Sequence, residues 1–550
     1  MSRPASPAQS QRRIAQSLRY PEQSREQSMS GVANPPSDQR RSDRFVFNLL
    51  WNWMGVAATL FSGFLLSPYL IRKLGPEAYG IWALCFSLVE YGTFLDLGFR
   101  SATVKYVAHY WALKDSTHLN KIVNTALLYA GLVSAGLFTI TFFLSRYLHL
   151  FFKVPADYLH SFRILIVLVS LTWCSGFVFS IFGACLEAIQ RFDLYSKANV
   201  TTTVLRAGGT ALLLYFGYGL IAIGVLVFFT QGFGYLLFYL FFRRIAPQLE
   251  VSVRHASRKT LRTMGSFGIH TFLINISSLF LNQSPPLLIG HFFVTAFVGY
   301  FQLPMRVIQY TVEAVGRIGI ITNTNAAELQ ARGDSQTLSK LAIYSNRYSL
   351  ALFMPLAVAL WTFGDRLFKL WYPSMAAYSA PLLPIMLAGY MMAVVAQFSS
   401  GMLLQGLGRH QWVGRGTLAE AIAVTVLLLV FLPRYGLIGG AWIVAVCMIL
   451  NRGIFAPWLV SREMKFSFAW FMHSIYTRPV IAAIPAAIVA VALRYTILPG
   501  RTWLQLFEVG VVIGSLYFAV AFFTCLPPEH RSRLLGLLAE KLPLRRLRTA

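Results

Sequence analysis

Five polar residues recur at helical spacing between positions 302 and 317, where an otherwise apolar chain concentrates its chemistry. They are Gln302, Arg306, Gln309, Glu313 and Arg317, separated by 4, 3, 4 and 4 residues. Because a helix turns by about 100° per residue, all five fall within one stripe. Guanidinium groups offer two donors to phosphate oxygens. The stripe therefore predicts one wall of a binding cavity, suited to a phosphate-bearing ligand.

The same stripe has a second interpretation, which is packing. Glu313 and Arg317 are four residues apart and can pair, which leaves Arg306 without a partner on its own helix. A charge at mid-bilayer costs roughly 2.5–3.5 kcal/mol on insertion scales, so the stripe must face protein or water. Ion pairs to neighbouring helices would satisfy this need without any ligand. The sequence leaves both interpretations open.

Three asparagines are further candidates for the cavity. Asn48 and Asn52 share a face of an expected helix over 45–70, and Asn275 lies in an expected helix over 262–287. These helices occupy corresponding places in an internal duplication, so we expect both to border the cavity. Interhelical hydrogen bonds that only hold the helices together are the alternative role.

The elements that position these residues are apolar helices. The chain has 550 residues, of which 56% are hydrophobic and 13% are charged, and its mean hydropathy is +0.57. Such a composition requires a bilayer. Runs of spanning length predict an all-α polytopic membrane protein with about 14 transmembrane helices. We expect them near 45–70, 80–98, 121–144, 163–188, 198–217, 220–242, 262–287, 293–320, 344–363, 381–404, 417–433, 436–459, 478–498 and 503–525.

A weak internal repeat organises these helices. The matching segments are 75–100 with 294–319, and 187–224 with 405–441. In this register Gly80 falls on Gly299, and Glu90 falls on Gln309. The repeat predicts two six-helix lobes in parallel orientation, plus two additional C-terminal helices. Tandem multi-helix units are typical of transporters, because two lobes can rock about a site between them.

The predicted organisation has six parts. They are a disordered cytoplasmic tail (1–44), an N-terminal lobe (45–242), a cytoplasmic linker (243–260), a C-terminal lobe (261–460), two additional helices (461–525) and a basic cytoplasmic tail (526–550). The last part carries leucines among basic residues, which indicates a helix lying on the inner leaflet.

The net charge of +27 is explained by membrane topology and does not indicate a nucleic-acid partner. If the N-terminus is cytoplasmic, about 34 of the 48 Lys and Arg lie on that side and about 10 on the other. This bias predicts a multi-pass protein with both termini in the cytoplasm. The expected partners in the bilayer are therefore membrane lipids.

Catalytic chemistry has no basis in the sequence. The loops between the expected spans are short, and no phosphate-binding GxxxxGK[ST] loop, HExxH motif or Cys/His metal spacing occurs. We therefore expect no enzyme activity, no catalytic residues, no cofactor and no metal.

Several segments together resemble a known family. Residues 68–82, followed by Leu95-Asp96-Leu97-Gly98, are similar to the opening of bacterial polysaccharide transporters, and so are 187–193 and 404–409 in their places. The resemblance covers about 45–460. It implies the fold of the multidrug/oligosaccharidyl-lipid/polysaccharide exporter superfamily, with two lobes around a cationic cavity. It also implies a flippase of the bacterial inner membrane for a polyprenyl-pyrophosphate-linked oligosaccharide, with a glycan polymerase and glycosyltransferases as possible partners.

Two other functions compete with this one. A cation-coupled multidrug exporter of the same fold would be expected to line its cavity with carboxylates, whereas the stripe carries more Arg than Glu. A membrane glycan polymerase or ligase would need a large extracytoplasmic loop, and none is present in the predicted topology.

Overall fold

The computed structural model describes residues 66–541 apart from 67, 97, 396–398 and 497–499. This part of the chain is helical, with one isolated bridge between Lys153 and Val294. Residues 68–90 are helical. The later helices are η2 (Tyr91–Asp96), α3 (Phe99–Ala112), α4 (Ser116–Leu144), α5 (Leu148–Phe151), η3 (Ala156–Tyr158), α6 (Leu159–Ala188), α7 (Phe192–Tyr215), α8 (Leu220–Ile245), η4 (Val253–His255), α9 (Arg258–Phe292), α10 (Ala296–Val315), α11 (Arg317–Arg332), α12 (Ser335–Trp371), α13 (Ala376–Ser379), α14 (Leu382–Val395), α15 (Gly401–Gly406), α16 (His410–Met448), η6 (Ile449–Phe455), α17 (Ala456–Glu463), α18 (Phe468–Tyr495), α19 (Trp503–Thr524) and α20 (Pro528–Lys541).

Seven helical stretches in the described residues are long and apolar enough to cross a bilayer. They are Ser116–Leu144, Ala156–Ala188, Leu220–Ile245, Ser335–Trp371, Gln411–Glu463, Phe468–Tyr495 and Trp503–Thr524. The stretch from Gln411 is interrupted at Gly436, whose φ of 61° and ψ of −158° only glycine adopts readily. This break lies where the sequence separates two spans. The chain is therefore a multi-pass, all-helical membrane protein, and the total of fourteen spans remains a prediction.

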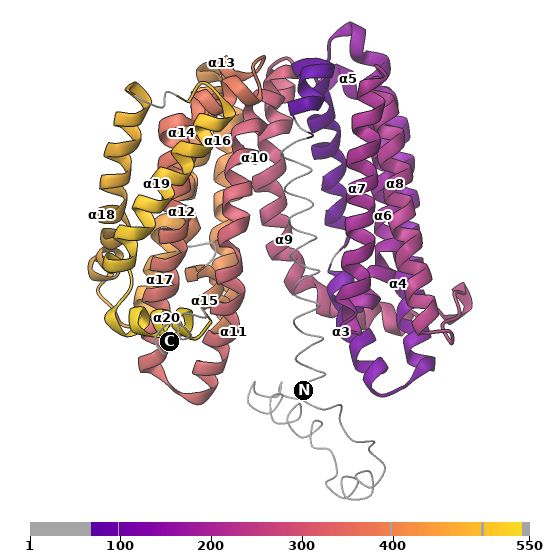
Figure 1. The fold of residues 1–550 in the computed structure, drawn as a ribbon. Helices are drawn as coiled ribbons and strands as arrows, with labels where there is room; N and C mark the ends of the chain where they lie inside the picture. Colours follow the sequence, from indigo (N-terminus) through magenta and orange to yellow (C-terminus); the bar gives the residue numbers. More distant parts are fainter. Residues whose placement is uncertain (1–65, 67, 97, 396–398, 497–499, 542–550) are drawn as a thin grey trace, which may run out of the picture.

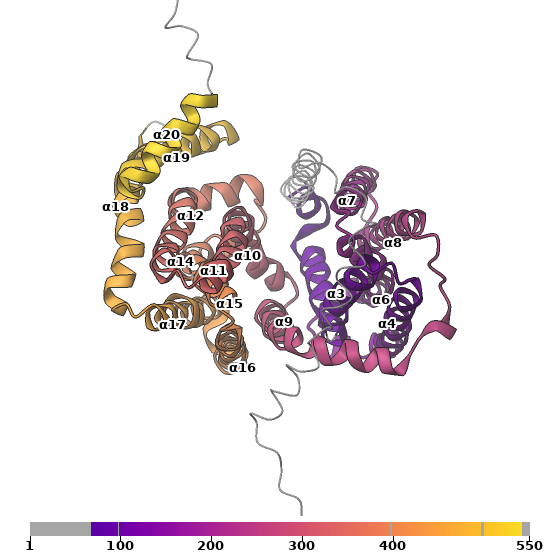
Figure 2. The ribbon, with the colours of Figure 1, turned by 90° about the horizontal axis from the view of Figure 1, so that it is seen from below.

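The helices gather in two groups that approach each other at one end (Figure 1). We call the helix 68–90 with α3, α4 and α6–α8 the N-terminal group, and α10–α17 the C-terminal group. Helices α18 and α19 pack on the outer side of the C-terminal group against α12 (Figure 2). A buried apolar cluster joins the C-terminal group to the helix 68–90 through Ile71, Tyr79, Phe301 and Leu303. The parallel repeat and the lobe boundaries remain predictions.

Helix α9 contacts both groups. It packs along α16, and its first part packs against α3 and α4. The preceding segment, which joins α8 to α9, is held on α4 by buried side chains. Asn120 donates to the Gln248 carbonyl at 3.2 Å, and Asn124 donates to the Glu250 carbonyl at 2.7 Å. The connection between the groups is therefore fixed to the N-terminal group.

The two groups meet closely at the end where α5 and α13 lie (Figure 1). A Cβ on Gly80 would overlap the carbonyl oxygen of Thr295 and lie 2.5 Å from its carbonyl carbon. A Cβ on Gly299 would lie 3.6 Å from the Gly80 nitrogen. Arg72 adds a hydrogen bond of 2.6 Å to the Leu370 carbonyl. We call these contacts the closing contact, and glycine is required at position 80 because a Cβ there would meet backbone.

Several expected helices differ from the structure in their ends, and two of them involve glycine or proline. The expected helix 293–320 is divided at Gly316, so that α10 ends at Val315 and α11 begins at Arg317. The expected helix ending near 287 instead continues through Pro285 and Pro286 to Phe292. Both prolines are accommodated because proline removes only single backbone donors, which neighbouring helices or waters can offset in a membrane helix.

Candidate functional site

A cavity of about 600 Å³ lies between the two groups. The helix 68–90, α7 and α8 form one side, and α9 and α10 form the other. Its polar lining consists of Tyr79, Ser87, Glu90, Thr203, Arg206, Thr210, Asn282, Gln283, Gln302, Arg306, Gln309 and Tyr310. Trp82 and Phe86 add aromatic surface, with ring centroids 4.6 Å apart. A mixed lining of this kind suits a large ligand that is partly polar and partly apolar.

The charges of the cavity come from opposite groups. Arg206 on α7 and Arg306 on α10 supply two guanidinium groups, and Glu90 supplies the one carboxylate among the described lining residues. The described lining therefore carries net positive charge. Since buried or membrane-embedded charges need compensation, an anionic ligand between the two arginines would be stabilised.

Arg306 points into the cavity and is exposed to it. Its guanidinium is hydrogen-bonded to the Tyr310 side chain, and Tyr79 and Tyr372 lie nearby. None of the described carboxylates comes within 4.0 Å of the guanidinium, although Glu90 lies within electrostatic range. The packing interpretation, which requires an ion pair for Arg306, finds no such pair among the described residues.

Glu90 is held by α9. Gln283 donates a hydrogen bond of 2.7 Å to the Glu90 carboxylate, and the hydroxyls of Tyr91 and Ser284 are 3.1 Å apart. Sequence reasoning did not select Glu90 as a site residue. The repeat contains a signal for it, because Glu90 corresponds to Gln309, which lines the same cavity.

The other two described residues of the stripe also lie on the cavity wall. Gln302 and Gln309 line it together with Arg306, and Gln309 is hydrogen-bonded to Tyr390 behind the wall. Further back, the buried Glu420 carboxylate accepts hydrogen bonds from Arg452 at 3.0 Å and from Asn451 at 2.6 Å. Glu420 and Arg452 are isolated in the sequence, and the structure pairs them.

For five predicted site residues the structure gives no position relative to the cavity. Asn48 and Asn52 lie outside the described residues. The side chains of Asn275, Glu313 and Arg317 also lie outside what the structure describes, although their backbones belong to α9, α10 and α11. Their contribution to the cavity remains a prediction.

Comparison with known proteins gives the class of this fold. The solved structure of the lipid II flippase MurJ in an inward closed conformation matches with a TM-score of 0.66 at 12% identity, covering 87% of this chain and 99% of that one. An inward-facing multidrug resistance MATE family transporter of the MOP superfamily matches with a TM-score of 0.63 at 14% identity, covering 76% and 98%. The chain therefore shares its fold with these two transporters.

Comparison of the sequence identifies the family of the chain. The family model described as "Polysaccharide biosynthesis protein" matches residues 69–375, which is more than half of the chain. The protein belongs to this family. A putative O-antigen transporter of Shigella flexneri is 22% identical over 427 residues, covering 76% of this chain and 97% of that protein. The resemblance noted from the sequence is thus confirmed at the level of the family.

Proposed function

We propose that this protein is a flippase that moves a polyprenyl-pyrophosphate-linked oligosaccharide across the bacterial inner membrane for surface polysaccharide biosynthesis. The observation that carries the proposal is the pair of arginines, Arg206 and Arg306, that face one cavity from opposite helix groups. Guanidinium groups bind phosphate oxygens through paired donors. The amide and hydroxyl groups around them can hydrogen-bond sugar hydroxyls.

The mechanism follows from the arrangement of the two groups. The pyrophosphate and the first sugars occupy the cavity while the polyprenyl chain stays in the lipid. Rocking of the groups then opens the cavity to one side of the membrane and closes it on the other. The closing contact at Gly80 and Gly299 supports this view, because it brings the two groups together at one end through close approach of their helices. The glycan polymerase and the glycosyltransferases of the same pathway are the proposed partners.

A multidrug exporter is the second candidate, and Glu90 is the observation that favours it. A cavity carboxylate can attract a cationic drug or a coupling proton. Glu90 already accepts a hydrogen bond from Gln283, however, and two arginines accompany it in the cavity. This balance of charge favours an anionic substrate.

The experiment for the function is a deletion strain. Loss of the gene is expected to abolish the surface glycan and to leave its lipid-linked precursor on the cytoplasmic side, and the intact chain restores export. Binding of a lectin to the precursor in inside-out and right-side-out vesicles shows on which side of the membrane the precursor lies. An unchanged surface glycan together with increased sensitivity to cationic drugs would contradict the flippase and support the exporter.

The proposed orientation makes a prediction about topology. Arg258 and Asp334 are expected to lie in the cytoplasm and Ala376 outside it, because basic residues concentrate on the cytoplasmic side. Fluorescent-protein fusions should therefore be active at Arg258 and Asp334, and an alkaline phosphatase fusion at Ala376. Paired alkaline phosphatase and fluorescent-protein fusions at each site provide the measurement. Phosphatase activity at Arg258 would reverse the orientation of both groups.

A further inference from the structure

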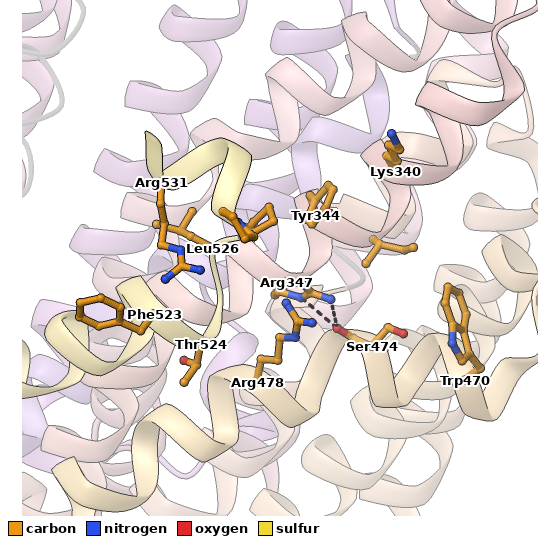
Figure 3. Close-up of a pocket in the computed structure, with 13 residues that line it drawn as sticks. Lys340, Tyr344, Arg347, Trp470, Ser474, Arg478, Phe523, Thr524, Leu526 and Arg531 are labelled. Carbon is orange, nitrogen blue, oxygen red and sulfur yellow. Dashed lines mark hydrogen bonds between the residues drawn. The ribbon is translucent and has the colours of Figure 1, made fainter. Parts of the chain in front are cut away.

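A second cavity, separate from the central one, lies at the C-terminal end of the chain. Its volume is about 590 Å³, and we call it the C-terminal pocket. The residues that line it belong to α12, α18, the end of α19 and the start of α20 (Figure 3). Helix α20 lies across this end of the molecule (Figure 1), and the hydrogen bond of 2.6 Å between Tyr348 and His530 holds it against α12.

The C-terminal pocket is strongly cationic. Lys340, Arg347, Arg478 and Arg531 line it, and no Asp or Glu does. Among the described residues, no carboxylate lies within 4.0 Å of any of these four groups. Asp334 interacts electrostatically with Lys340 from beyond that distance, and Glu529 on α20 does not line the pocket. Four positive charges thus converge without a counter-charge from the described protein.

The arginines are held in place by contacts that do not neutralise them. Arg347 is buried and donates two hydrogen bonds, of 2.9 and 2.7 Å, to the Ser474 carbonyl. Arg478 lies close enough to repel it (Figure 3). Arg531 stands over the Phe523 ring at 5.8 Å, and its buried Nε finds no hydrogen-bond partner. Preorganised guanidinium groups without a carboxylate partner are what a phosphate group requires.

Much of the remaining lining is apolar and points to a lipid. Trp470, Phe523, Leu526 and Pro527 form apolar surfaces of the pocket, beside the polar groups of Tyr344, Ser474 and Thr524. Leu535, one helical turn beyond Arg531 on α20, is 54% exposed, as expected for a helix at a membrane surface. Basic pockets between membrane helices bind the headgroups of anionic lipids, whereas a free phosphate would not need the apolar surfaces.

We propose that the C-terminal pocket binds the phosphate headgroup of an anionic phospholipid from the leaflet on which α20 lies. The phosphate lies between Arg478 and Arg531, and the first carbons of the acyl chains lie against the aromatic and proline surfaces. The bound lipid neutralises the four cations and joins α18, α19 and α20 to α12. This role does not depend on what the central cavity transports.

Lipid titration of the purified full-length protein in neutral detergent tests the proposal. Dioleoyl phosphatidylglycerol, dioleoyl phosphatidylcholine and inorganic phosphate are added separately, and the change in melting temperature and the bound lipid by native mass spectrometry are measured. The pocket variant is R478Q/R531Q. The matched control is R415Q/R462Q, which removes the same charge from arginines stacked on Trp412 and Trp458 outside the pocket.

We expect phosphatidylglycerol to raise the melting temperature of the wild type and the control, with at least a tenfold weaker apparent affinity in the pocket variant. R531Q alone, which leaves α18 unchanged, is expected to show an intermediate loss of affinity for phosphatidylglycerol. It replaces the double variant in the comparison if the double variant does not fold. An equal response of both double variants would overturn the proposal. So would an equal effect of phosphatidylcholine. An equal effect of inorganic phosphate would overturn the lipid assignment.

Discussion

Arg306→Ala is expected to abolish export of the glycan while the protein stays at normal abundance in the membrane. Hydrogen bonds to charged groups contribute about 1.5–3 kcal/mol each, so losing two of them lowers phosphate affinity roughly a hundredfold or more. Stability should be retained, because the Arg306 guanidinium faces the cavity and has no ion pair with a described carboxylate. Arg306→Lys keeps the charge and loses the paired donors, so partial export is expected.

Complementation of a deletion strain, with immunoblotting of membranes and quantification of the lipid-linked precursor, measures this result. Arg434→Ala is the matched control, because Arg434 is exposed on α16 away from the cavity. Full complementation by Arg306→Ala at normal abundance would show that Arg306 does not hold a ligand phosphate. The polar stripe on α10 would then be better explained by packing.

Gly80→Ala is expected to impair transport because it weakens the closing contact. The added methyl group would overlap the Thr295 carbonyl, which is backbone and cannot move as a side chain does. Overpacking costs typically 1–3 kcal/mol, so the population of the state with this end closed should fall roughly five- to 150-fold. A transporter that loses one of its two states cannot complete its cycle.

Cysteine accessibility distinguishes this effect from misfolding. Ser87→Cys on the cavity wall is expected to react faster with a membrane-impermeant maleimide added outside the cell when Gly80→Ala is present. Gly131→Ala is the matched control, since a Cβ on Gly131 in α4 meets nothing within 4 Å. Unchanged export and unchanged labelling in Gly80→Ala would show that the contact does not govern access.

The sequence predicted the helical class, because bilayer thickness imposes length and apolarity on every spanning helix. It predicted the family through several short segments that resemble that family in their places. It predicted helix ends less well. The expected helix continued to 320, yet α10 ends at Val315, directly before Gly316. Prolines are strong signals, yet α9 continues through Pro285 and Pro286. Helix ends depend on tertiary contacts, which the sequence does not display.

The polar stripe was predicted in part. Helical periodicity relates Gln302, Arg306 and Gln309, which lie on one cavity wall, and their binding role stays a prediction. Periodicity cannot relate Arg306 to Arg206 on α7, because the two arginines come together only when the groups pack. Likewise, Arg347 meets the Ser474 carbonyl across 127 residues of sequence. Contacts of this kind follow from the fold and not from local pattern.

The segment between α8 and α9 bears on the order in which the chain assembles during synthesis. Asn120 and Asn124 are buried in α4, and their backbone partners at Gln248 and Glu250 are made 126 or more residues later. Buried amides without partners are costly, so α4 cannot reach its final packing until this segment has left the ribosome. The N-terminal group is therefore not a self-sufficient folding unit. It matures only after the segment that joins it to α9 has been made.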